Sequence, residues 1–117
     1  MPAYLVAEVE VTNRAGFEPY GAAAGATVTQ YGGRFLVRGG ATELIEGGPA
    51  PKTVVVVKFP DAAALKHWYG SPEYQKILPN RLDSSTGRLF IVEGVSSPFL
   101  EKRGATNISL QGGATTR

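Results

Sequence analysis

Four consecutive valines occupy positions 54–57, inside the segment KTVVVVKF at residues 52–59. β-branched side chains favour extended structure, and successive side chains of a strand point to opposite faces of the sheet. A run of four valines therefore makes both faces of the strand apolar, which is typical of a central strand that is covered on each side. The segment predicts a sheet whose two faces both need to be covered.

Three other segments have the pattern of strands. Residues 4–11 (YLVAEVEV) alternate, with one apolar face and one mixed face. Residues 34–47 form a long extended segment in which Gly39 and Gly40 predict a bulge or a bend, within one strand or between two short ones. Residues 88–95 (RLFIVEGV) are expected to form the last strand.

A first helix is predicted between the first two strands. Thr12 or Asn13 can cap its start, and the pair Gly32 and Gly33 is expected to end it in a left-handed turn. Pro19 is tolerable because it falls near the first turn. The apolar positions recur at intervals of three and four residues, and they are Phe17, Tyr20, Ala24, Val28 and Tyr31.

A second helical region follows the valine strand and is expected to consist of two pieces. Asp61 can cap the first piece, which Gly70 ends. Ser71 can cap the second piece, where Pro72 takes the first helical position. Pro79 is expected to interrupt this second piece, because a proline inside a helix removes a backbone hydrogen bond.

The order strand, helix, strand, strand, helix, strand predicts an α+β fold of the ferredoxin-like βαββαβ type, with a four-stranded antiparallel sheet and the helices on one face. The opposite face would display Tyr4, Val6 and at least two valines, so a second copy of the sheet is expected to cover it. The single domain is predicted at residues 1–95. Residues 96–117 are expected to form a flexible C-terminal tail, in which residues 107–111 could add an edge strand.

Composition excludes several classes of function. With 43% hydrophobic and 19% charged residues, the chain is expected to be a soluble globular protein, and its start lacks a secretion signal, so a cytoplasmic location is expected. Residues 1–95 hold nine Lys and Arg against nine Asp and Glu, so the net charge of +2 comes from the tail and no basic stripe for nucleic acid is expected. The absence of cysteine and the single histidine, His67, exclude thiolate and multi-histidine metal sites. We expect no metal, cofactor, nucleic acid or membrane partner, and we expect His67 to be exposed.

Three segments, YGGRFLVRGG, IEGGPAPKTVVVVKFP and WYGSPEYQKILPNR, strongly resemble the bacterial family catalogued as domain of unknown function 1330. The resemblance covers residues 4–95. It implies a dimeric α/β barrel, in which two ferredoxin-like protomers pair sheet to sheet. The family has no established activity, whereas relatives in its superfamily include cofactor-free monooxygenases, muconolactone-type isomerases and haem-degrading enzymes, with ligands held between the sheet and the helices. Such an analogy of fold is a weak basis for function.

The aromatic segment around Trp68 supplies the candidates for a ligand-binding site. Tyr74 and Arg81 are seven residues apart, nearly two helical turns, so they could place a phenol and a guanidinium at the rim of a pocket. Arg38 is an alternative clamp for an anion, and Trp68 could form a wall. Packing is the competing interpretation, because aromatic residues at helical spacing usually belong to a core.

The predicted function is therefore the binding of a small organic molecule, such as a carboxylate, by a homodimer that could act as a cofactor-independent monooxygenase or isomerase. In an enzyme of this kind Tyr20 or Tyr74 would donate a proton, and Glu46 would be a candidate base. The alternative is a non-catalytic dimeric module in which the same residues serve packing alone. Phenols and one arginine can orient an anion without chemistry, so both interpretations stay open.

Overall fold

The computed structural model describes residues 1–95, so the expectations for residues 96–117 lie outside the described residues. Seven elements follow one another in the chain, and they are β1 (Ala3–Val11), α1 (Arg14–Gln30), β2 (Arg34–Arg38), β3 (Thr53–Phe59), α2 (Ala62–Tyr69), α3 (Pro72–Ser84) and β4 (Ser85–Glu93). The four strands form one antiparallel sheet, and the α+β ferredoxin-like class expected from the sequence is confirmed.

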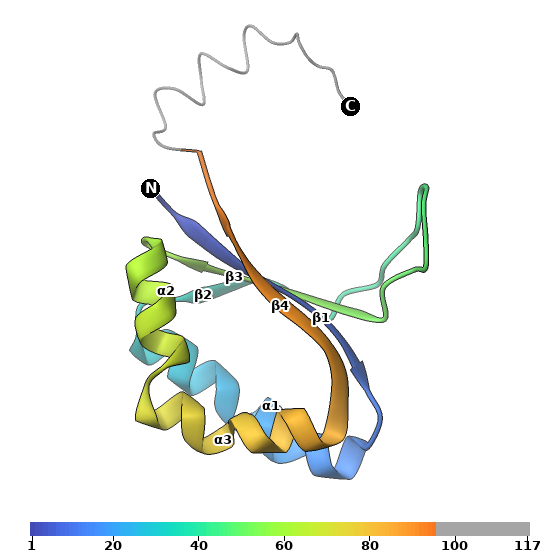
Figure 1. The fold of residues 1–117 in the computed structure, drawn as a ribbon, viewed down its shortest axis with the longest axis horizontal. Helices are drawn as coiled ribbons and strands as arrows, with labels where there is room; N and C mark the ends of the chain where they lie inside the picture. The colour runs from blue at the N-terminus through green and yellow to red at the C-terminus, as the bar shows by residue number, and fades with distance from the viewer. Residues whose placement is uncertain (96–117) are drawn as a thin grey trace, which may run out of the picture.

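The strands lie in the order β2-β3-β1-β4, and α1, α2 and α3 all pack on one side of the sheet (Figure 1). β1 is central: its Leu5 lies opposite Val57 of β3 and Ile91 of β4. The core forms between this side of the sheet and the helices, and its buried members are Ala3, Leu5, Val28, Val57, Phe59, Leu65, Trp68, Tyr74 and Leu78. The strict alternation of β1 explains why one of its faces supplies the core.

The other face of the sheet carries a second set of apolar side chains. Val6 lies opposite Val56 on β3 and Phe90 on β4, and Tyr4 lies opposite Val92. No part of residues 1–95 covers this outer face, where 38% of Phe90 and 45% of Val92 stay exposed. The expectation that Tyr4, Val6 and two valines share one face is confirmed.

Strand β2 is shorter than expected from the sequence. It ends at Arg38, and the register shift lies between Phe35 and Val37 rather than at the two glycines that follow. Gly39 takes φ +73°, a left-handed conformation that turns the chain after its amide has bonded to Val54. Because β3 begins at Thr53, the residues beyond this turn have no strand to pair with. The prediction of a strand extending to residue 47 is therefore wrong.

Helix α3 does not stop at Pro79, contrary to the expectation. It continues to Ser84, and β4 starts at the next residue, three positions earlier than expected. Pro79 lies on the exposed side of the helix, so water can satisfy the Gln75 carbonyl that loses its backbone partner. The unbroken helix keeps Tyr74 and Arg81 on one rigid element.

The predicted helix caps are present. Asn13, rather than Thr12, caps α1 by accepting a hydrogen bond from the amide of Gly16, and Asp61 and Ser71 cap α2 and α3 in the same way. After α1, Gly32 adopts φ +89° and turns the chain into β2. Within the described part of the chain, no helix is long and apolar enough to cross a bilayer. The cytoplasmic location expected from the sequence stays a prediction.

Candidate ligand-binding site

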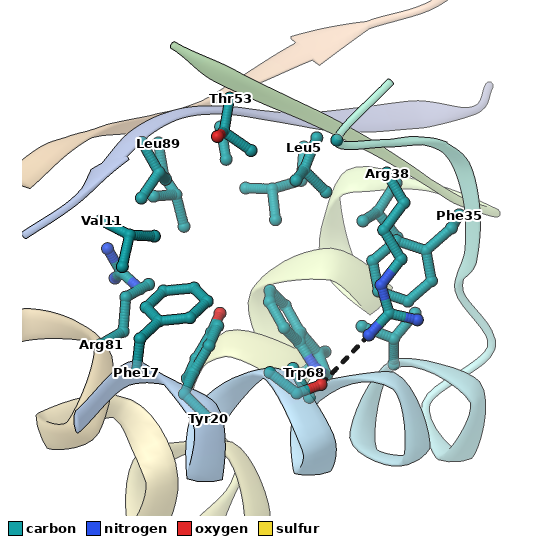
Figure 2. Close-up of a pocket in the computed structure, with 18 residues that line it drawn as sticks. Leu5, Val11, Phe17, Tyr20, Phe35, Arg38, Thr53, Trp68, Arg81 and Leu89 are labelled. Atoms are coloured by element: carbon teal, nitrogen blue, oxygen red, sulfur yellow. Dashed lines mark hydrogen bonds between the residues drawn. The ribbon is translucent and has the colours of Figure 1, made fainter. Parts of the chain in front are cut away.

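A cavity of about 230 Å³ lies between the helix-facing side of the sheet and the helices (Figure 2). Most of its lining consists of aliphatic and aromatic side chains from β1, β3, α1 and α2. The polar or polar-tipped side chains in the lining, apart from the indole of Trp68, are Tyr20, Arg38, Thr53 and Arg81. An apolar cavity with a few converging polar groups is the usual form of a small-molecule site.

Arg81 is the polar side chain whose environment is most unusual. It projects from α3 to the cavity, and only 8% of it is exposed. Its Nε has no hydrogen-bond partner, and the one ion pair within residues 1–95 joins Glu8 and Arg88 instead. A buried donor on a charged group that lacks a partner costs about 1–3 kcal/mol or more. Arg81 therefore places a positive charge beside the cavity, on a group that has an unpaired donor.

Two tyrosines form a hydroxyl pair beside this guanidinium. The hydroxyl oxygens of Tyr20 and Tyr74 lie 2.9 Å apart, and Tyr74 is completely buried behind Tyr20. Burial raises the pKa of Tyr20 far above its ordinary value, and Tyr74 raises it further, while the opposing effect of Arg81 is smaller. Tyr20 is thus a neutral phenol that can donate or accept a hydrogen bond, and it holds its proton tightly near neutral pH.

Arg38 lies at the other end of the cavity, at the last position of β2 (Figure 2). Its guanidinium carbon stands 4.2 Å from the centre of the Phe35 ring, and its Nη2 donates to the carbonyl of Gly21 over 3.2 Å. The residue is exposed, in contrast to Arg81. Its position between β2 and α1 places a second positive charge at the mouth of the cavity.

Trp68 forms part of the cavity wall and is fixed by a polar contact. Its Nε1 donates to the hydroxyl of Thr27 over 3.0 Å, and only 1% of the residue is exposed. Its ring centroid lies 4.2 Å from that of Tyr74. Because its ring packs against Tyr74 and its indole N–H is bonded, Trp68 is a rigid surface against which a ligand can pack.

The structure brings together four of the six candidate residues predicted from sequence: Tyr20, Arg38, Trp68 and Arg81 all line the cavity. Tyr74 does not line it and reaches it through the hydroxyl of Tyr20. Glu46 is exposed in the connection between β2 and β3, outside the lining. The roles assigned to these residues stay predictions.

Three further side chains bear on the sequence analysis, namely His67, Phe35 and Thr53. His67 is exposed, as expected, and its ring stands edge-on against Tyr31 with centroids 5.1 Å apart. Sequence analysis did not single out Phe35 or Thr53 as site residues, although both line the cavity. The sequence contained a weak indication that Thr53 faces a site, because it is a polar residue at the start of an apolar central strand. There was no such indication for Phe35.

The family follows from a comparison of the whole sequence. A family described as "Domain of unknown function (DUF1330)" matches residues 2–95. The chain belongs to this family. No curated protein matches the sequence significantly.

Solved structures share the fold at low sequence identity. A protein of unknown function from Rhodopseudomonas palustris is 19% identical, with a TM-score of 0.67 over 82% of this chain and 84% of its own. SnoaB from Streptomyces nogalater, described as a cofactor-independent oxygenase, is 18% identical, with a TM-score of 0.55 over 83% of this chain and 96% of its own. Rv0793 from Mycobacterium tuberculosis is 16% identical, with a TM-score of 0.53 over 84% of this chain and 99% of its own. At these identities the likeness concerns the fold alone.

The chemical character of the cavity follows from its lining. Among the lining residues the charged groups are two guanidiniums, and no Asp, Glu or His of residues 1–95 belongs to the lining. Within the same described range, no group of three or more His, Asp or Glu side chains is placed to hold a metal ion. The arrangement can bind an anion with an apolar body and can donate a hydrogen bond from a neutral phenol.

Proposed function

We propose that this member of the DUF1330 family binds a small organic acid in the cavity, with the carboxylate on Arg81 and the apolar body against the sheet and Trp68. The observation that carries the proposal is Arg81, a buried arginine that lines a mostly apolar cavity and whose Nε has no partner within residues 1–95. A carboxylate gives a guanidinium two parallel charge-assisted hydrogen bonds, which removes the cost of the unpaired donor.

The size of the cavity limits the acid. An engineered apolar cavity of about 150 Å³ binds benzene. The cavity here measures about 230 Å³, which leaves room for one ring with a substituent or for a short aliphatic chain. We therefore propose a single-ring aromatic acid or a short-chain acid as the ligand class. A polycyclic ligand would need the sheet and helices to separate.

A binding experiment tests the proposal directly. Small acids such as benzoate and hexanoate are added to the purified protein, and the melting temperature is followed. A ligand at 100 times its Kd stabilises the native state by about 2.7 kcal/mol, which for a domain of this size is a shift of roughly 10 °C. We expect Arg81→Met to abolish the shift and Arg34→Met, an exposed arginine outside the cavity, to preserve it.

The outcome also separates the two predicted functions. The complete burial of Tyr74 and the near-complete burial of Trp68 favour packing roles for these two rings, as the non-catalytic module requires. If a broad panel of acids gives no shift, the carboxylate site is wrong and the packing module becomes the better description. A shift that survives Arg81→Met would mean that acids bind elsewhere.

The catalytic part of the proposal concerns a reaction without a cofactor. SnoaB, a fold relative, is described as a cofactor-independent oxygenase, which supports a search for chemistry of this kind in the cavity. In such a reaction Arg81 would stabilise an anionic form of the substrate. Tyr20 would donate a hydrogen bond to it and keep its proton, because burial raises the pKa of Tyr20. Turnover of a bound acid with no metal or flavin added would support an enzyme, and binding without turnover would leave a binding protein.

We also propose that the protein is a homodimer that pairs through the outer face of the sheet. The support is the apolar row formed by Val6, Val56 and Phe90, with Tyr4 and Val92 beside it, which no described residue covers. Light scattering at micromolar concentration is expected to give about twice the chain mass of 12.4 kDa. A monomer that keeps this face exposed would contradict the proposal.

A further inference from the structure

We propose that the acid bound in this cavity carries a second anionic group, and that Arg38 binds it at the end opposite Arg81. The inference rests on the proposed function, since it assigns the class of ligand for the same cavity. The two arginines come from different elements, β2 and α3, yet they line one cavity and stand at opposite ends of it (Figure 2).

The lining between the two guanidiniums is apolar over most of its extent. In the close-up Leu5 and Leu89 project from the sheet and Phe17 from α1 into the space that separates Arg38 from Arg81. A ligand that spans this space therefore needs an apolar middle. Neither end of the cavity has a carboxylate within residues 1–95 to neutralise its arginine. Two anionic groups joined by an apolar body match this distribution of charge.

Arg38 has donors left for a ligand. A guanidinium carries five N–H donors, and the described contacts of Arg38 use one of them, the bond from Nη2 to the Gly21 carbonyl. That bond and the stacking on Phe35 hold the planar group in place without covering its other donors. An orientation fixed in advance lowers the conformational entropy that binding would otherwise cost.

Gly25 on α1 provides the room for this orientation. A Cβ at position 25 would lie 3.3 Å from Nη1 of Arg38, which is closer than most real contacts, and 3.5 Å from Nη2, which is an ordinary contact distance. Glycine in the middle of a helix is destabilising relative to alanine. Its presence directly beneath the guanidinium is explained if the position of Arg38 matters more than the stability of the helix.

The ligand class is a short diacid with an aromatic or aliphatic middle, and matched pairs of acids test it. Calorimetry compares benzoate with terephthalate, and hexanoate with adipate, on the full chain. Because the second carboxylate gains hydrogen bonds to a charged group, each diacid is expected to bind at least about ten-fold more tightly than its matched monoacid. Arg38→Gln is expected to lower the affinity for the diacids far more than the affinity for the monoacids, and so to remove this preference.

Two variants keep the result interpretable. Arg34→Gln changes an exposed arginine on the same strand, outside the cavity, and is expected to preserve the diacid preference. Gly25→Ala leaves Arg38 in the sequence but crowds its guanidinium, so it is expected to weaken the diacid preference while raising thermal stability.

Each outcome decides the inference. Equal affinity for diacids and monoacids, or an equal loss of both in Arg38→Gln, would overturn the second anchor while leaving the site at Arg81 intact. If neither class of acid binds, the proposed function and this inference fail together. If diacids bind more tightly and Arg38→Gln alone removes the difference, the cavity is a two-anchor diacid site.

Discussion

Replacing Arg81 with methionine is expected to make the unliganded protein more stable while it removes ligand binding. Arg81→Met keeps much of the side-chain volume and eliminates the buried Nε that has no partner within residues 1–95. Relief of that unpaired donor is worth about 1–3 kcal/mol. The loss of the guanidinium that stands 5.8 Å from the Tyr20 ring subtracts roughly 0.5–1 kcal/mol.

The balance is a gain of about 1 kcal/mol in the free energy of unfolding, which corresponds to a rise of roughly 4–8 °C in melting temperature. Urea denaturation and a thermal melt, both without ligand, measure the change. Arg34→Met is the matched control and is expected to stay within about 0.5 kcal/mol of the wild type, because position 34 is exposed. This pattern is typical of a functional residue that costs stability.

A large loss of stability in Arg81→Met would refute this reasoning. It would mean that the guanidinium makes stabilising contacts in the folded protein, so that its role is structural. The interpretation of the cavity as a ligand site would then lose its main support.

Two further predictions concern hydrogen bonds that join α3 to α1 and to Tyr31, the residue after α1. Tyr20→Phe leaves the buried hydroxyl of Tyr74 without its partner and is expected to lower the free energy of unfolding by about 1–3 kcal/mol in denaturation experiments. The double variant with Tyr74→Phe should recover part of that loss. Additive effects of the two changes would contradict the pairing. The hydroxyl of Tyr31 donates to Glu73 over 2.6 Å, which lowers the pKa of Glu73 and raises the pKa of Tyr31. Glu73 binds its proton more weakly in the folded state. The pair therefore stabilises the fold above the unfolded Glu pKa of about 4.3, and this stabilisation is lost as the pH falls through the folded pKa of Glu73. On the alkaline side the stabilisation is lost above about pH 10, as the pH rises through the raised folded pKa of Tyr31. Thermal melts across pH should therefore be flatter at the acid end for Glu73→Gln, and an unchanged profile would show that the contact is not formed in solution.

The central valine strand and the starts of the helices were predictable because their signals are local. The run of valines at positions 54–57 reports burial on both faces of β3, and both faces prove to be apolar. Asn13, Asp61 and Ser71 cap helices where such side chains can bond to a free amide. These features depend on neighbours a few residues away, so the sequence carries them directly.

The errors in the fold have a different origin. Whether Pro79 ends a helix depends on whether water reaches the carbonyl one turn earlier, and the exposure of that side of α3 is a tertiary property. The length of β2 depends on the partner strand, because residues after Gly39 have nothing to pair with once β3 has begun at Thr53. Neither the exposure of one side of α3 nor the start of the partner strand β3 can be read from composition.

The site was predictable in part. Trp68 and Arg81 could be proposed from helical spacing, and both line the cavity. Glu46 was proposed only because a carboxylate could serve as a base, and no periodicity fixes the position of a residue in a long connection. Phe35 enters the lining through the sheet order, which places β2 at the edge beside β3. Contacts of this kind, between segments far apart in the sequence, depend on the fold as a whole.

A crystal structure with 4-bromobenzoate bound would test the central claim most directly, because the anomalous signal of bromine locates the ligand independently of the refinement of the protein. We expect the carboxylate within about 2.7–2.9 Å of the Arg81 guanidinium, and the bromine among the apolar lining residues. Bromine outside the cavity, or a carboxylate inside it that does not touch Arg81, would contradict the account.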